Sequence, residues 1–204
     1  KIVEVRQGQL QTFGVAHHDV ELKGYWDSSS LRRLARVVED ILEGGDFAGV
    51  KTVVSVQSKD VYVTTMDFDS GFNKRQIQNE IEKQAPYFLP YPPDEMRLSW
   101  SKIDNDPRIE TYTGKQRVII NALPDFVIEN SKNLLEHCNL DGIALENQTI
   151  SQIRACLTPD RGNTVLVDYG ANQTTFSIVV DGILRSSSHI PVGSSGITKE
   201  LAES

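Results

Sequence analysis

Residues 162–193 limit the fold most, because they predict three strands joined by two tight turns. The β-branched, apolar run at 164–167 predicts a buried strand, and a second strand is expected at 174–180. Asp181-Gly182 is a dipeptide typical of two-residue hairpins, so a third strand is expected at 183–190. This part of the chain therefore predicts an antiparallel meander.

The first turn of this meander, at 168–172, has the residue types of a phosphate-binding loop. Gly170 lets backbone N–H groups approach a phosphate closely, and the hydroxyls of Thr174 and Thr175 can add donors. Asp168 stands at the mouth of the turn, where a carboxylate can hold a Mg²⁺-bound water. The alternative for an Asp-x-Gly pattern alone is an ordinary meander whose glycine only makes the turn.

Length and charge set the class of protein. The chain has 204 residues, enough for one good core or two small ones, and 39% of them are hydrophobic. Its formal net charge of −7 argues against a nucleic-acid surface, which needs a basic stripe. No apolar run approaches the ~18–20 residues that span a bilayer, and no signal peptide is visible. Because the chain begins at Lys1 inside an apparent strand, we expect a piece of a longer protein.

Two pairs of side chains are candidate metal ligands by type but not by spacing. Cys138 and Cys156 lie in expected helices, and we expect both to be buried free thiols of a reducing compartment. His17 and His18 are neighbours on a strand expected at 12–20. Adjacent residues of a strand point to opposite faces, so the two imidazoles cannot hold one ion. We therefore expect no metal site.

A helix is expected at 31–42, after an N-cap in the Asp27–Ser30 stretch. Its apolar residues fall on one face, and Arg32, Arg33 and Arg36 fall on the other. An anion-binding patch and a solvated face are both compatible with these arginines, and the pattern favours the solvated face.

The second informative stretch is 86–95, which contains four prolines. We expect an extended, stiff connector there, between a helix at 73–85 and a strand at 96–103. The stretch has no repeated P-x-x-P, which disfavours a ligand of proline-binding modules.

Residues 168–198 resemble the second phosphate loop of the actin-like superfamily, which includes sugar kinases, Hsp70 and actin. The form is that of two bacterial families, the type IV pilus assembly proteins PilM and the cell-division proteins FtsA. The matching residues are Asp168, Gly170, Ala171, Thr174, Asp181-Gly182, Ile190-Pro191-Val192-Gly193 and Ile197-Thr198. Tyr169 replaces the usual Ile. The stretch 88–95, FLPYPPDE, is similar to the PilM pattern, with Leu89 in place of Ile.

The resemblance covers nearly the whole chain and implies an α/β, actin-like (ribonuclease H-like) fold with an inserted α/β subdomain. Residues 1–50 and 123–204 would form a discontinuous actin-like subdomain, and residues 51–122 the insert. The first phosphate loop would lie upstream of Lys1, and the second lobe would be incomplete. The nucleotide cleft of this chain is therefore expected to be incomplete.

The function implied by the PilM resemblance is structural rather than enzymatic. Such a protein would be a cytoplasmic, ATP-binding scaffold that docks the N-terminal peptide of a PilN-type inner-membrane protein and links it to the pilus motor ATPases. It would reach the membrane only through this partner. The implied ligand is ATP with Mg²⁺ in the full-length protein, with none expected in this chain.

The resemblance also implies two sets of site residues. The nucleotide phosphate and Mg²⁺ set comprises Asp168, Gly170, Ala171, Asn172, Thr174 and Thr175. The groove for the partner peptide would lie between the actin-like core and the insert, with Phe88, Leu89 and Tyr91 as its candidates because they border the insert.

Three alternatives stay open at this point. The chain could belong to an FtsA-like protein that tethers a division filament to the membrane, to a small-molecule kinase of the same superfamily, or to an adaptor that binds no nucleotide. Other chemistries lack their motifs: the sequence has no Walker A loop, no G-x-G-x-x-G, no zinc spacing and no nucleophile elbow.

Overall fold

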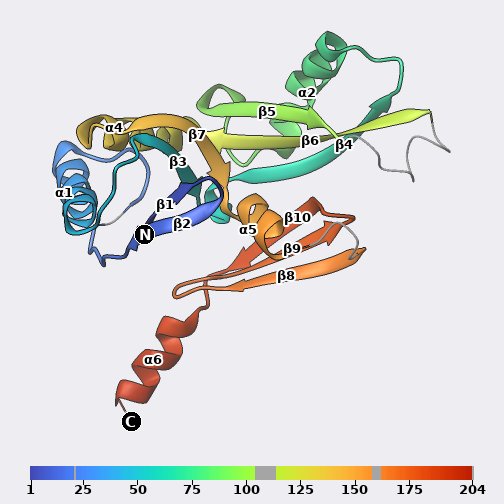
Figure 1. Ribbon diagram of the computed structural model, residues 1–204. Coiled ribbons are helices and arrows are strands. Elements are labelled where there is room, and N and C mark those ends of the chain that lie inside the picture. The colour runs from blue at the N-terminus through green and yellow to red at the C-terminus, as the bar shows by residue number, and fades with distance from the viewer. Residues whose placement is uncertain (21, 104–113, 158–161, 204) are drawn as a thin grey trace. The chain divides into compact units, whose positions relative to one another are not determined.

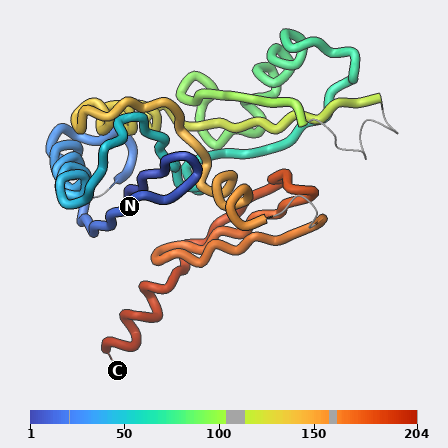
Figure 2. The backbone as a smooth tube through the Cα atoms, viewed as in Figure 1, coloured from blue at the N-terminus to red at the C-terminus, as the bar shows by residue number. Residues whose placement is uncertain are grey.

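The computed structural model describes residues 1–20, 22–103, 114–157 and 162–203, in which the chain forms ten strands and five α-helices (Figure 1). These residues form two compact units, and each unit is built from two separate stretches of chain, as the colours along Figure 2 show. Residues 1–54 and 125–146 form the first unit, and residues 55–124 and 147–204 form the second. No helix in the described ranges is long and apolar enough to cross a membrane.

The first unit contains two two-stranded sheets and two helices. One sheet is the hairpin of β1 (Ile2–Arg6) and β2 (Gln9–Gly14), and the other pairs β3 (Lys51–Val56) with β7 (Asp141–Asn147). Gln7 and Gly8 both have positive φ, the geometry of a two-residue hairpin turn. β2 ends at Gly14, so the prediction of a strand at 12–20 is wrong beyond that residue, and His17 and His18 lie in irregular chain.

Helices α1 (Ser28–Gly44) and α4 (Asp125–His137) form the core of the first unit. α1 begins at Asp27, whose side chain accepts a hydrogen bond from the backbone N–H of Ser30, and this bond lowers the pKa of Asp27. The packed side chains are buried: Leu34, Ala35, Leu135 and Cys138. Burial raises the pKa of the Cys138 thiol. Cys156 is exposed, so the prediction of two buried thiols is wrong for this one.

The second unit contains two three-stranded antiparallel sheets. The first has the order β4 (Tyr62–Asp69), β6 (Lys115–Pro124), β5 (Met96–Lys102), and α2 (Lys74–Phe88) covers one of its faces. Their shared core consists of Phe68, Ile77, Ile81, Val118 and Ile120. Two 3-10 turns, η1 (Ser58–Asp60) and η2 (Pro93–Glu95), precede β4 and β5.

The end of α2 corrects the prediction for the proline-rich stretch. α2 continues through Pro86 to Phe88, so the extended connector begins only at Leu89. Pro86 has no backbone N–H to donate within the helix, and α2 ends two residues later, at Phe88. Phe88 is thereby turned inward, where its ring stacks on Tyr62 with 5.7 Å between centroids.

The second sheet of this unit has the order β10 (Ile183–Ile190), β9 (Thr174–Val180), β8 (Asn163–Tyr169). The meander predicted from the sequence is confirmed, including its turn, where Asp181 and Gly182 both have positive φ. Helix α5 (Gln148–Cys156) packs on one face through Ile153, which meets Val179 and Leu184. The chain then ends in α6 (Ser194–Glu203), which has no buried residue.

Candidate functional site

The turn between β8 and β9 has the backbone geometry of a tight loop. Gly170 donates its N–H to the carbonyl of Gln173 at 2.9 Å, which closes the turn. A Cβ on Gly170 would stand 3.0 Å from that same carbonyl, so a larger residue would crowd it. Ala171 and Asn172 at the tip are exposed. In the described part of the chain, no protein acceptor takes the N–H of either residue, so both amides are available to a ligand.

Asp168 lies at the end of β8 and is held by two side-chain amides. Its Oδ2 accepts hydrogen bonds from Nε2 of Gln148 at 2.7 Å and from Nε2 of Gln152 at 2.9 Å. Both glutamines belong to the first turns of α5, where a spacing of four residues puts them on one side of the helix. The half-buried carboxylate is therefore oriented by neutral donors, and its other oxygen has no protein donor within the described residues.

The two threonines of the predicted site are both buried. Thr174 donates its hydroxyl to the carbonyl of Val192 at 2.6 Å, so this group fastens the end of β10 to β9. Thr175 is paired directly with Asp168 on one side and with His189 on the other. Residues directly opposite in a ladder point to the same face. Asp168, Thr175 and His189 thus form one polar row across the sheet.

The start of α6 is attached to the same turn. Ser194 and Ser195 donate their backbone N–H groups to the carbonyls of Gly170 and Ala171, at 3.0 and 2.8 Å. A Cβ on Gly193 would lie 2.4 Å from the carbonyl oxygen of Ala171, so only glycine permits this approach. Both serines lie in the first turn of α6.

The three candidates for a peptide groove have different surroundings. Phe88 is half-buried, stacks on Tyr62 and packs against the core under α2. Leu89 ends α2 by donating its N–H to the carbonyl of Ala85 at 3.0 Å. Tyr91 is exposed, with 46% of its surface accessible, and Tyr87 is 88% exposed. Of the three candidates, Tyr91 is the most exposed.

Sequence reasoning missed two residues of this site, Gln148 and Gln152, and gave no role to a third, Gly193. The glutamines carried a weak signal, since both follow the Asn147 cap at helical spacing, but nothing in the sequence links them to a strand 16 residues further on. Gly193 was included in the matching motif without a reason, and the reason is its contact with the turn.

A family model described as type IV pilus assembly protein PilM matches residues 5–203 of the chain. The chain belongs to the PilM family. This membership confirms the resemblance stated from residues 88–95 and 168–198, and it places the turn at Asp168 in a pilus assembly protein of actin-like type.

Three known proteins are similar to the chain. The chain has a TM-score of 0.74 and 13% identity to a structure titled PilM-PilN type IV pilus biogenesis complex, covering 92% of this chain and 56% of that one. The cytoplasmic domain of EpsL, an inner-membrane component of the type II secretion system of Vibrio cholerae, has a TM-score of 0.50 and 12% identity to the chain. That match covers 86% of this chain and 60% of the EpsL domain. The cell division protein FtsA of Neisseria meningitidis serogroup B (strain MC58) is 26% identical over 163 residues, which cover 73% of this chain and 36% of FtsA.

These comparisons establish an actin-like α/β fold for this PilM-family chain. The chain spans little more than half of the PilM structure that it matches, and about a third of FtsA. The division into an actin-like subdomain and an insert stays a prediction. The two compact units follow contacts within the chain, and they group residues 147–204 with 55–124.

Proposed function

We propose that this chain is part of a scaffold of the type IV pilus inner-membrane platform, and that it binds the cytoplasmic N-terminal peptide of a PilN-type membrane protein. The observation that carries the proposal is the family match over residues 5–203, supported by the fold shared with a PilM-PilN complex. In this proposal the protein is cytoplasmic, contacts the inner membrane through that partner and passes force or signals to the pilus motor ATPases.

The turn at 168–172 supports a second part of the proposal, nucleotide binding by the full-length protein. The exposed N–H groups of Ala171 and Asn172 suit a phosphate, and Gly170 leaves room for it. The free oxygen of Asp168 suits a water bound to Mg²⁺. ATP with Mg²⁺ would supply a charged ligand that orders the turn. We assign no catalytic residue and expect this chain to bind ATP weakly.

Peptide binding is tested by fluorescence anisotropy of a labelled PilN-type N-terminal peptide titrated with this chain, with and without Mg-ATP. We expect saturable binding that Mg-ATP does not change. A scrambled peptide of the same composition is the control. Absence of binding by the native peptide, or equal binding of the scrambled one, contradicts the scaffold proposal.

The groove is tested by Tyr91→Ala. Tyr87→Ala is the matched control, because it removes an equally large and more exposed ring four residues earlier, at the end of α2. We expect Tyr91→Ala to weaken peptide binding about tenfold, as loss of an aromatic anchor does, and Tyr87→Ala to leave it unchanged. Equal effects of the two would show that Tyr91 does not line the groove. Phe88→Ala is unsuitable, because it would damage the core under α2.

Nucleotide binding is tested with a fluorescent ATP analogue and the full-length protein. Asp168→Asn should weaken Mg²⁺-dependent binding at least tenfold, because a neutral amide no longer attracts the hydrated cation. Asp181→Asn, at the opposite end of the same sheet and at a positive φ that asparagine tolerates, is the matched control. Unchanged affinity in Asp168→Asn favours the adaptor that binds no nucleotide.

A further inference from the structure

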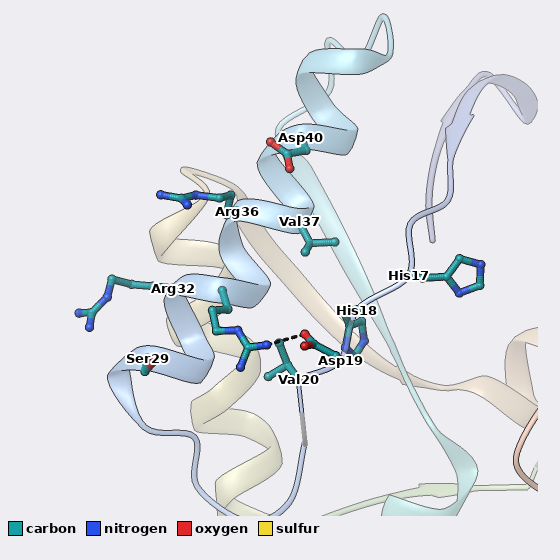
Figure 3. A pocket seen from close by; sticks show the side chains of 10 residues that line it. His17, His18, Asp19, Val20, Ser29, Arg32, Arg36, Val37 and Asp40 are labelled. Atoms are coloured by element: carbon teal, nitrogen blue, oxygen red, sulfur yellow. Dashed lines mark hydrogen bonds and ion pairs between the residues drawn. The ribbon is translucent and has the colours of Figure 1, made fainter.

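Two hollows of the first unit differ in what their walls offer a ligand. A trough of about 750 Å³ lies between α1 and residues 17–20. Figure 3 shows Arg32 and Arg36 extending away from that segment, so the charged groups of the trough do not converge on a ligand. The second hollow is a groove of about 440 Å³ between α4 and β7, and most of the residues that line it are apolar.

One wall of this groove is β7, which has a free edge. Within the described ranges β7 pairs only with β3, so no strand lies along its other edge. Asp141 donates its backbone N–H to the carbonyl of Val50, directly before β3, at 2.8 Å. Because neighbouring residues of a strand direct their backbone groups to opposite sides, Gly142 and Ala144 direct theirs toward the free edge. Each of these two residues offers one donor and one acceptor there.

The free edge of β7 lacks the side chains that usually protect an edge strand. Natural sheets place charged residues or proline at exposed edges, which discourages pairing with another chain. Residues 142–145 are Gly-Ile-Ala-Leu, without charge or proline, and residues 141–144 are exposed. Gly142 and Ala144 also have the smallest side chains, so another main chain can approach closely. An extended peptide can therefore add to this edge as a further strand.

The other wall of the groove is α4. Ile128, Lys132 and Leu135 line it from one side of the helix, as their spacing of four and three residues requires. The helix lies close to β7 at Gly142, where a Cβ would be 2.5 Å from Cδ1 of Leu135. A strand added to the free edge would direct every second side chain toward the face that α4 covers. Because Ile128 and Leu135 are apolar, they favour apolar residues at those alternate positions.

The charges along the groove restrict the ligand further. Lys132 forms an ion pair with Glu136, with 3.8 Å between Nζ and Oε1, so these two charges offset each other. The side chain of Asp141, at the start of β7, has no hydrogen bond or ion pair among the described residues. The groove thus has one uncompensated negative charge at one end, which favours a cation at the matching end of the ligand.

We propose that the groove between α4 and β7 binds an extended peptide segment by strand addition to the edge of β7. The main chain of the segment pairs with Gly142 and Ala144. Its apolar residues, at alternate positions, contact Ile128 and Leu135, and a Lys or Arg lies beside Asp141. Residues 141–145 span about 17 Å at ~3.4 Å per residue, so about five residues of the ligand are paired. This site is independent of the groove proposed at Tyr91.

A second copy of the chain fits this edge less well than a lone peptide does. Antiparallel pairing of two β7 strands needs a twofold axis perpendicular to the sheet, which is the symmetry of an isologous dimer. That axis puts the α4 helices of both copies on the same face, on either side of the new junction. Since α4 forms a wall of the groove beside its own free edge, the two helices would compete for the same space. A single peptide has no such helix.

The peptide test uses the 204-residue chain and a fluorescein-labelled nonapeptide with Lys near one end, followed by Val and Thr in alternation. We expect saturable binding in fluorescence anisotropy. N-methylation of every second residue removes the donors along one edge of the peptide only. Methylation of one alternate set should weaken binding at least tenfold, because the donors to β7 are lost, and methylation of the other set should change it less than twofold. Equal behaviour of the two methylated peptides overturns strand addition.

Ala144→Pro tests the edge from the side of the protein. The N–H of Ala144 points away from β3, so proline removes no bond between the two strands and the fold should survive, which circular dichroism checks. Peptide binding should weaken at least tenfold, because a donor is lost and the ring blocks the approach of the peptide. Unchanged binding in Ala144→Pro overturns the proposal. So does self-association that Ala144→Pro abolishes without binding of the peptide, since a second copy then occupies the edge.

Asp141→Asn tests the charged end of the groove. Binding of the Lys-containing peptide should weaken about two- to fivefold, and binding of the same peptide with Gln in place of Lys should stay the same. Asp181→Asn makes an equal change of charge at a residue that does not line the groove, and it should alter affinity less than twofold. Equal effects of the two variants overturn the placement of the cation beside Asp141.

Discussion

The two faces of the sheet β10-β9-β8 differ both in composition and in cover. On one face, Val179 and Leu184 are buried against Ile153 of α5. On the other, the side chains are 41–62% exposed: Val165, Val167, Tyr169, Phe176, Ile178 and Ile190. The register puts these residues opposite one another, as in the pairs Val165–Ile178 and Val167–Phe176, so they form one continuous surface.

This difference shows what the order of apolar and polar residues in a strand indicates about its two faces. A half-exposed antiparallel strand alternates apolar and polar residues, whereas a strand covered on both faces is apolar at nearly every position. β8 and β9 each have three polar residues in seven positions, but most of their exposed positions are apolar. The sheet β4-β6-β5 provides the contrast, because Asp67 and Arg117 form an ion pair on the face away from α2. The apolar residues on the exposed face of β8 and β9 thus favour a covering layer that α5 does not supply.

Leu184→Ala gives the largest expected effect and tests the covered face. Leu184 is 2% exposed, so its truncation should leave a cavity and lower the free energy of unfolding by about 2–5 kcal/mol. Urea denaturation measures the change. Ile178→Ala is the matched control on the exposed apolar face of the same sheet, which we call the bare face. It should lower the free energy of unfolding by less than about 1 kcal/mol. Similar losses for both would mean that the bare face is covered in solution.

Gln148→Met with Gln152→Met tests the polar end of the covered face. Both donors to Asp168 are lost, and the half-buried carboxylate is left without its side-chain partners, so unfolding at pH 7 should need about 1–3 kcal/mol less. Gln84→Met, which removes an amide bonded to Glu80 near the surface of α2, is the control and should change stability by less than about 0.5 kcal/mol. If the double variant is as stable as the control, Asp168 faces water.

Asp60→Asn tests a partly buried acid in η1, next to β10. Burial raises the pKa of Asp60, so its ionisation opposes folding. Folding therefore favours the protonated form of Asp60. This contribution to stability is fully present below the pKa of the unfolded chain, about 3.9, and it is lost as the pH rises through the higher pKa of the folded state. The variant should therefore gain stability relative to the wild type between pH 4 and pH 7. A constant difference across denaturation curves in this range would contradict it.

Val167→Ser tests the bare face itself and has the smallest expected effect on folding. Val167 is 52% exposed, so the free energy of unfolding should change by no more than about 0.5 kcal/mol. The continuous apolar surface would shrink, and sedimentation at increasing concentration should show less self-association than in the wild type. Self-association that is unchanged in Val167→Ser would place any contact between copies elsewhere.

Local chemistry made much of the fold predictable. The Asp181-Gly182 hairpin, the α1 cap at Asp27 and the strand pattern of β8 and β9 each depend on residues near in sequence. Predictions failed where distant packing decided the outcome. Pro86 lies inside α2 although proline disfavours a helix interior, and Cys156 is exposed although its helix is amphipathic.

The candidate site was predictable in its turn and not in its support. Gly170 and Asp168 belong to a motif that can be read from the residue types. Gln148 and Gln152 reach Asp168 only because α5 packs across β8, a contact that no local pattern encodes. The hydroxyl of Thr174 was expected to face a ligand, and in the structure it bonds to Val192.

Helix α6 is attached to the turn at 168–172, so a small rotation at this turn would become a larger displacement at the far end of the helix. Its first amides are bonded to the carbonyls of Gly170 and Ala171, and no residue of its ten is buried, so the turn contributes to its direction. Ten residues extend about 15 Å at 1.5 Å per residue. A tilt of about 10° at the turn would displace the far end by roughly 2.6 Å over that length. A change too small to alter the sheet would thus become a movement large enough for another protein to detect.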